Sequence, residues 1–78
     1  MFMSIKVRYF ASLKESLGRS EDVLAFTEGL TVDAVWQASN HQPLPKQVLA
    51  AVNMDYVALD SLVNDGDEVA FFPPVTGG

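Results

Sequence analysis

The chain has 78 residues, of which 49% are hydrophobic, and its ten acidic and five basic residues give a formal net charge of −5. This length allows one small domain, and the apolar content is sufficient for a packed core and argues against intrinsic disorder. The acidic charge and the lack of any basic run disfavour a nucleic-acid partner, and the lack of cysteine excludes disulfides and thiolate chemistry.

The first part of the chain predicts two strands that flank a short helix. The segment SIKVRYF alternates between apolar and mostly polar residues, which is typical of a half-buried strand. SLKESLG predicts a short helix that begins with a capping box of Ser12 and Glu15 and ends at Gly18 in a left-handed conformation. EDVLAF predicts the second strand.

A longer helix is predicted at about residues 32–41. Thr31 is a favourable N-cap, and Asp33 complements the helix dipole in the first turn. Trp36 lies on the apolar face of this helix, where packing in the core is expected. Pro43 ends the helix and begins a loop.

The last part of the chain predicts three further strands. VLAAV reads as a buried strand, YVAL as a brief one, and NDGD as a turn in which Gly66 takes a positive φ. EVAFF is apolar on both faces, which is typical of a central strand with two buried faces. A first and a last strand that pair at the centre, with the long helix crossing one face, predict an α+β fold of β-grasp topology.

No side chain is predicted to carry out catalysis or to bind a metal. His41 is the only histidine and lies at a predicted helix end, where exposure to solvent is expected. The acidic residues Asp65, Asp67 and Glu68 do not have the spacing of a calcium loop, and a turn accounts for them. We therefore expect no bound metal and no bound cofactor.

The chain ends in FFPPVTGG, where a pair of prolines precedes a pair of terminal glycines. The prolines favour an extended path away from the sheet, and the six residues 73–78 can reach about 20 Å. The glycines lack Cβ atoms and can pass through a narrow channel. A carboxylate that is activated as an acyl-adenylate can be attacked by a sulfur nucleophile, which would give a thiocarboxylate. We predict a domain over 1–72 and an extended tail over 73–78, with the carboxylate of Gly78 as the working group.

The sequence resembles the small, sulfur-carrier subunit of molybdopterin synthase, a ubiquitin-like β-grasp family. The resemblance rests on VRYFASLKESLG, on LAAVN and, most specifically, on NDGDEVAFFPPVTGG. A terminal Gly-Gly alone is shared with ubiquitin-like modifiers and with the sulfur carrier of the thiamine pathway. Lys14 stands where the family often has arginine, in the short helix and away from the tail.

The resemblance implies a mixed sheet of about five strands, a crossing helix and one short helix. It implies that an ATP-dependent adenylating enzyme activates Gly78, that a sulfur donor protein supplies the sulfur, and that the thiocarboxylate donates it to cyclic pyranopterin monophosphate. The active site belongs to the large subunit, with which the family forms a heterotetramer, so the carrier is not an enzyme on its own. The implied docking residues are Phe72, Pro73 and Pro74, and the residues that enter the partner's active site are Val75, Thr76, Gly77 and Gly78.

Two alternatives to this function come from other classes of protein. A related carrier of the thiamine type, or a protein modifier, would share the fold and the terminal chemistry. A plain interaction module would have an inert tail. The chain shows no signal peptide and no apolar run of the about 20 residues that a bilayer requires, so a cytoplasmic protein without a membrane partner is expected.

Overall fold

Five strands form one mixed sheet, and its order places the first and last strands side by side at the centre. The computed structural model describes residues 3–45 and 47–73. The strands lie in the order β2-β1-β5-β3-β4. In chain order the elements are β1 (Ser4–Tyr9), α1 (Ala11–Leu17), β2 (Glu21–Ala25), α2 (Val32–Asn40), β3 (Leu49–Val52), β4 (Asp55–Val57) and β5 (Glu68–Phe72). Neither described helix has the length and apolarity that a membrane crossing requires.

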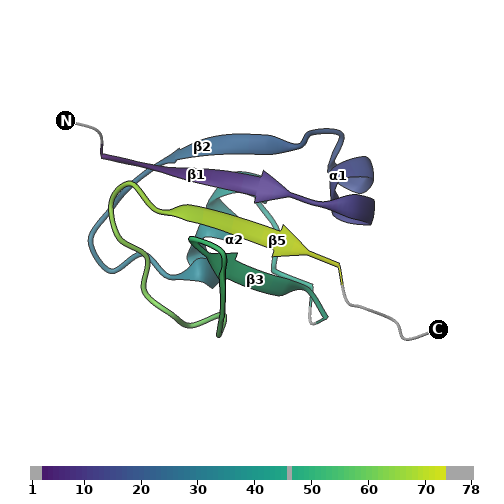
Figure 1. Ribbon diagram of the computed structural model, residues 1–78. Helices are drawn as coiled ribbons and strands as arrows, with labels where there is room; N and C mark the ends of the chain where they lie inside the picture. Colours follow the sequence, from purple (N-terminus) through teal and green to yellow (C-terminus); the bar gives the residue numbers. More distant parts are fainter. Residues whose placement is uncertain (1–2, 46, 74–78) are drawn as a thin grey trace.

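The pairing of β1 with β5 is parallel, whereas the other pairs are antiparallel. The carboxyl ends of both central strands therefore lie at the same edge of the sheet, next to α1 (Figure 1). The long connection between β2 and β3 contains α2, which packs across one face of the sheet. The predicted five-stranded β-grasp topology, with one crossing helix and one short helix, is confirmed.

The core lies between α2 and the sheet, and Trp36 is at its centre. This side chain is only 1% exposed and meets Phe71 of β5 edge-on, with 5.0 Å between the ring centroids. Tyr9 of β1 approaches the same indole at 5.9 Å. The predicted burial of Trp36 is confirmed. The other buried residues are Ile5, Val7, Leu30, Val32, Val35, Val48, Ala50, Ala51, Val63 and Val69.

The predicted ends of the helices are confirmed except at the start of α1. The Thr31 hydroxyl accepts a hydrogen bond from the backbone N–H of Ala34 at 3.2 Å and caps α2. Gly18 ends α1 with φ +74°. The capping box at Ser12 is wrong, because Ser12 lies inside α1, which begins at Ala11 and has Phe10 as its N-cap, without a side-chain hydrogen bond. The backbone N–H of Phe10 donates a hydrogen bond to the carbonyl of Phe71 in β5, so β1 continues directly into α1.

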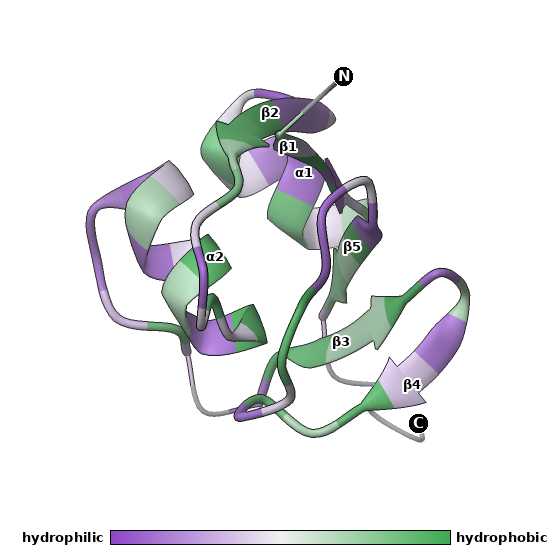
Figure 2. Ribbon diagram, turned by 90° about the vertical axis from the view of Figure 1, so that its left-hand side faces the viewer, coloured by the Kyte–Doolittle hydropathy of each residue, from purple (hydrophilic) through white to green (hydrophobic). Residues whose placement is uncertain are grey.

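β5 is the central strand, as predicted, but only one of its faces is buried within this chain. Val69 and Phe71 are fully buried toward α2. Ala70 and Phe72 point to the opposite face and are only partly buried. Figure 2 shows α2 on one side of β3 and β5. The prediction of two buried faces is therefore wrong for the isolated chain, and an apolar sheet face remains uncovered.

Candidate functional site

The predicted tail begins at a point that the sheet holds firmly. β5 ends at Phe72, which is opposite Leu49 of β3. The residue before it, Phe71, is paired with β1 on one side and with β3 on the other. Pro73 follows and is the last described residue, partly buried. The other predicted tail residues, which are Pro74, Val75, Thr76, Gly77 and Gly78, lie outside the described residues, so their roles and the division of the chain at residue 72 stay predictions.

A hollow of about 290 Å³ lies on the uncovered face of the sheet, directly beside this point. We call it the ring-lined hollow because three aromatic rings border it. The ring of Phe10 stacks on that of Phe72 with centroids 4.9 Å apart and an interplanar angle of 7°. Tyr56 lies 5.9 Å from the same Phe72 ring. The complete lining is Arg8, Phe10, Ala51, Met54, Tyr56, Glu68, Ala70 and Phe72.

The strand order brings these residues together from four segments of the chain. Alternation along the central strands turns Ala70 and Phe72 outward, and Ala51 of β3 is directly opposite Ala70. These alanines are small and form the floor between the rings. The hairpin between β3 and β4 turns through Asn53 and Met54, both at positive φ, as in the tight turns that match the twist of paired strands.

The ring-lined hollow is mainly apolar and is exposed in this chain. Tyr56 is 72% exposed and Met54 is 91% exposed, although such side chains are favourable to bury. Uncovered apolar surface that is rimmed by polar residues is typical of a binding surface. The volume is at the lower end of the range of about 300–1,000 Å³ that small-molecule sites occupy.

A second hollow, of about 450 Å³, is larger but is not lined by the residues at which the predicted tail begins. It opens where β3 and β4 diverge, and its lining contains neither Phe72 nor Pro73. The lining residues are Val48, Leu49, Ala50, Tyr56, Val57, Ala58 and Leu59. We assign the functional surface to the smaller hollow because the predicted reactive segment begins there.

The acidic turn before β5 is structural, as predicted. The carboxylate of Asp67 accepts hydrogen bonds from the backbone N–H of Asn64 at 2.8 Å and from the side-chain amide of Asn53 at 2.9 Å. Asp65 accepts from the backbone N–H of Ser4 at 2.9 Å. In residues 3–45 and 47–73, no group of three potential ligands could hold a metal ion.

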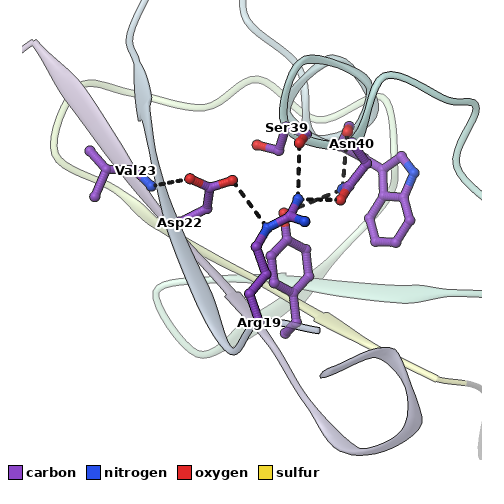
Figure 3. Close-up of polar contacts among 7 residues, drawn as sticks. Arg19, Asp22, Val23, Ser39 and Asn40 are labelled. Atoms are coloured by element: carbon purple, nitrogen blue, oxygen red, sulfur yellow. Dashed lines mark hydrogen bonds and ion pairs between the residues drawn. The ribbon is translucent and has the colours of Figure 1, made fainter. Parts of the chain in front are cut away.

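A polar network at the other end of α2 joins the loop before β2 to the end of the helix (Figure 3). The Arg19 guanidinium donates hydrogen bonds to the backbone carbonyl of Ser39 and to the side-chain oxygen of Asn40. It also lies 5.2 Å from the ring centroid of Tyr9. The bond to Ser39 satisfies a carbonyl that the helix end leaves free, and together the contacts stabilise the fold. His41, predicted to be exposed, is exposed and caps this helix in a left-handed conformation.

The residues of the ring-lined hollow were identified only in part from the sequence. Phe72 was predicted as a docking residue, but Phe10 and Tyr56 were not. One feature of the sequence could have indicated Phe10. It continues the alternating series of Lys6 and Arg8, which predicts the solvent-facing side of the first strand, where an aromatic side chain is unexpected. Phe10 is 37% exposed, even though its ring stacks on Phe72.

Comparisons with known proteins find relatives of this chain in both sequence and fold. Residues 7–78 match the ThiS family. The chain is 43% identical over 81 residues to the molybdopterin synthase sulfur carrier subunit of Escherichia coli (strain K12). The match covers 95% of this chain and 99% of that protein. It is 36% identical to the subunit of the same name from Haemophilus influenzae, with the same coverage. SAMP1 from Haloferax volcanii has a similar structure, with a TM-score of 0.79 and 26% identity over 96% of this chain and 99% of that one.

Proposed function

Because the chain belongs to the ThiS family, we propose that it is the sulfur-carrier subunit of a molybdopterin synthase and that the carboxylate of Gly78 carries the sulfur. The observation that carries this proposal is the end of the central strand at Phe72, beside an uncovered aromatic face and directly before PPVTGG in the sequence. The full-length similarity to curated sulfur carrier subunits supports the same function.

The chemistry takes place at the terminal carboxylate and needs no side chain of this protein. An oxygen of the Gly78 carboxylate attacks the α-phosphorus of ATP in an adenylating enzyme, and pyrophosphate leaves. Hydrosulfide supplied by a sulfur donor protein then attacks the acyl carbon of the adenylate, AMP leaves, and the hydrosulfide proton passes to water. The product is a thiocarboxylate, which explains how a chain without cysteine can carry sulfur.

The sulfur is then delivered inside the large subunit, which provides the catalytic side chains. The thiocarboxylate sulfur bonds to a carbon of cyclic pyranopterin monophosphate while an oxygen substituent leaves that carbon. Water then hydrolyses the resulting thioester, which leaves the sulfur on the pterin and returns the Gly78 carboxylate for another cycle. Because a dithiolene contains a pair of sulfur atoms, each molybdopterin consumes a pair of thiocarboxylates. A heterotetramer with a central dimer of large subunits fits this demand.

The ring-lined hollow and the adjoining prolines form the docking surface in this proposal. Docking there covers the outward rings of Phe10, Tyr56 and Phe72, and it fixes the strand end from which the tail enters the partner. The tail sequence Val75, Thr76 and Gly77 then lies between the docking surface and the reacting carboxylate. Glycine at the end leaves the acyl carbon accessible in a narrow channel.

A reconstituted single turnover tests the proposal. Thiocarboxylated chain, the large subunit from the same organism and cyclic pyranopterin monophosphate are mixed, and molybdopterin is measured as its fluorescent oxidation product. We expect one product per pair of carriers. The matched control is a chain that lacks Gly78 but keeps the docking surface, and it should bind the large subunit without forming product. Product from this truncated chain, or none from the thiocarboxylated chain, would contradict the proposal.

A protein modifier is the second candidate, and the similarity to SAMP1 supports it, since that name denotes a small archaeal modifier protein. In this case the activated Gly78 would form an amide with a lysine of another protein. Incubation of the tagged chain with ATP, the adenylating enzyme and a cell extract would then give covalent adducts that resist reducing agents. Peptides that carry a Gly-Gly remnant on lysine would identify them.

A further inference from the structure

The ring-lined hollow has a cation at its rim that docking would bury. Arg8 extends from β1, and its guanidinium lies 5.7 Å from the ring centroid of Phe10. Its Nη1 atom is 3.4 Å from an Oε2 oxygen of Glu68, and the Arg8 side chain is 46% exposed. The distance is longer than the usual N–H···O range of about 2.7–3.2 Å, so this ion pair is weak.

The guanidinium has donors that the described residues leave unused. It carries five N–H groups in a planar fork, and only the Nη1 contact to Glu68 is recorded within residues 3–45 and 47–73. Glu68 is also opposite Lys6 in the register of β1 with β5, but no ion pair joins these two side chains. Glu21 is opposite Arg8 on β2, but no ion pair joins these two side chains.

An apolar partner surface alone would be a poor match for this arrangement. Covering the rings would remove water from the free donors of Arg8, and a buried charge without hydrogen bonds is costly. A carboxylate from the partner would replace that water, because its two oxygens fit the guanidinium fork. The stacking of Arg8 over Phe10 already holds the fork at the rim of the hollow, which lowers the entropy lost when such a pair forms.

This inference rests on the proposed function: we propose that the Arg8 guanidinium pairs with a carboxylate of the large subunit at this surface. The large subunit inserts an apolar side chain into the ring-lined hollow and places a carboxylate against the Arg8 guanidinium. The carrier has a formal net charge of −5, so a generally acidic partner would be repelled. The geometry therefore points to a single carboxylate beside an apolar anchor, on a partner surface that is otherwise apolar or basic.

Calorimetric titration of the large subunit with carrier variants tests this assignment. Arg8→Met keeps a long apolar side chain and removes the fork, so we expect the Kd to rise about tenfold. Lys6→Met is the matched control, since it removes a cation from the same face of β1 outside the hollow. It should change the Kd by less than about twofold, as exposed surface charges usually do. The affinity of the wild-type chain should fall with salt more steeply than that of Arg8→Met.

Cross-linking supplies a second measurement that a merely structural role for Arg8 would not change. In the Arg8→Lys variant, a carbodiimide should join the amine at position 8 to the partner's carboxylate, and mass spectrometry of the peptides would locate the bond. An unchanged or lower Kd for Arg8→Met in a folded chain would overturn the assignment and leave the proposed function intact. Cross-links to Glu68 alone would also overturn it. If the wild-type chain does not bind the large subunit, both proposals fail.

Discussion

Neighbouring phenylalanines on β5 face opposite sides of the sheet, so their truncation should separate folding from docking. Phe71 is fully buried and packs edge-on against Trp36 at 5.0 Å. Replacing a buried phenylalanine with alanine costs about 3–5 kcal/mol. A chain of 78 residues has a total free energy of unfolding of about 4–12 kcal/mol. Phe71→Ala should therefore remove a large share of the stability and leave a partly unfolded population.

Phe72→Ala should instead leave the domain folded and weaken docking. Its ring contacts Phe10 at 4.9 Å and Tyr56 at 5.9 Å on the uncovered face. Each aromatic pair contributes about 0.5–1.5 kcal/mol, and exposure reduces the sum, so we expect a loss of about 1–2 kcal/mol in unfolding free energy. A central aromatic anchor of an interface contributes about 2 kcal/mol or more to binding, which is about a 30-fold rise in Kd.

Two measurements on the same preparations test this separation. Urea denaturation gives the free energy of unfolding of each variant, and calorimetric titration with the large subunit gives the Kd. Phe71→Leu, which keeps most of the buried volume, is the control for the core position. The reasoning is refuted if Phe72→Ala is destabilised as much as Phe71→Ala, or if folded Phe72→Ala binds the large subunit as tightly as the wild-type chain.

Three further predictions concern the parts of the fold that hold this surface in place. Arg19→Ala removes charged hydrogen bonds at the end of α2 that contribute about 1.5–3 kcal/mol, so the Tm should fall by at least about 6 °C. The control is Lys14→Ala, at an exposed position, which should have the Tm of the wild-type chain. Gly66→Ala should lower the free energy of unfolding by about 1–2 kcal/mol, because alanine is strained at the φ of +86° that Gly66 adopts. The added Cβ meets no atom within 4 Å, so the expected cost is purely conformational. An unchanged midpoint in urea denaturation would contradict it. Asp67→Ala should lower the Tm because the turn loses the hydrogen bonds that this carboxylate accepts. Neither EDTA nor calcium should change the Tm of the wild-type chain. A rise in Tm with calcium would show that the turn binds metal.

The fold could be predicted from the sequence because its local signals agree with its topology. Thr31 caps the crossing helix, Gly18 ends the short one, and Gly66 takes the positive φ that the turn requires. The capping box at Ser12 failed because a tertiary hydrogen bond between Phe10 and β5 extends the first strand to the start of the helix. Sequence spacing alone contains no information about such a bond.

The ring-lined hollow could be predicted only in part, because its residues meet through strand order. Phe10 and Phe72 are distant in the sequence and stack because β1 pairs in parallel with β5. The two apolar faces of β5 indicated burial on both sides. The same pattern arises where only one face is covered by the domain, and only the structure shows that the outer face of β5 is uncovered in residues 3–45 and 47–73. The role of Gly78 stays a prediction from the sequence and the family.

The most direct test of the central claim is the intact mass of the chain after activation. The chain is incubated with ATP, its adenylating enzyme and a sulfide donor, and fragmentation then locates any modification. We predict a mass increase that corresponds to the exchange of one oxygen for sulfur, confined to Gly78 and absent without ATP. An unchanged mass with an enzyme that is active on another carrier, or sulfur located anywhere except Gly78, would contradict the account.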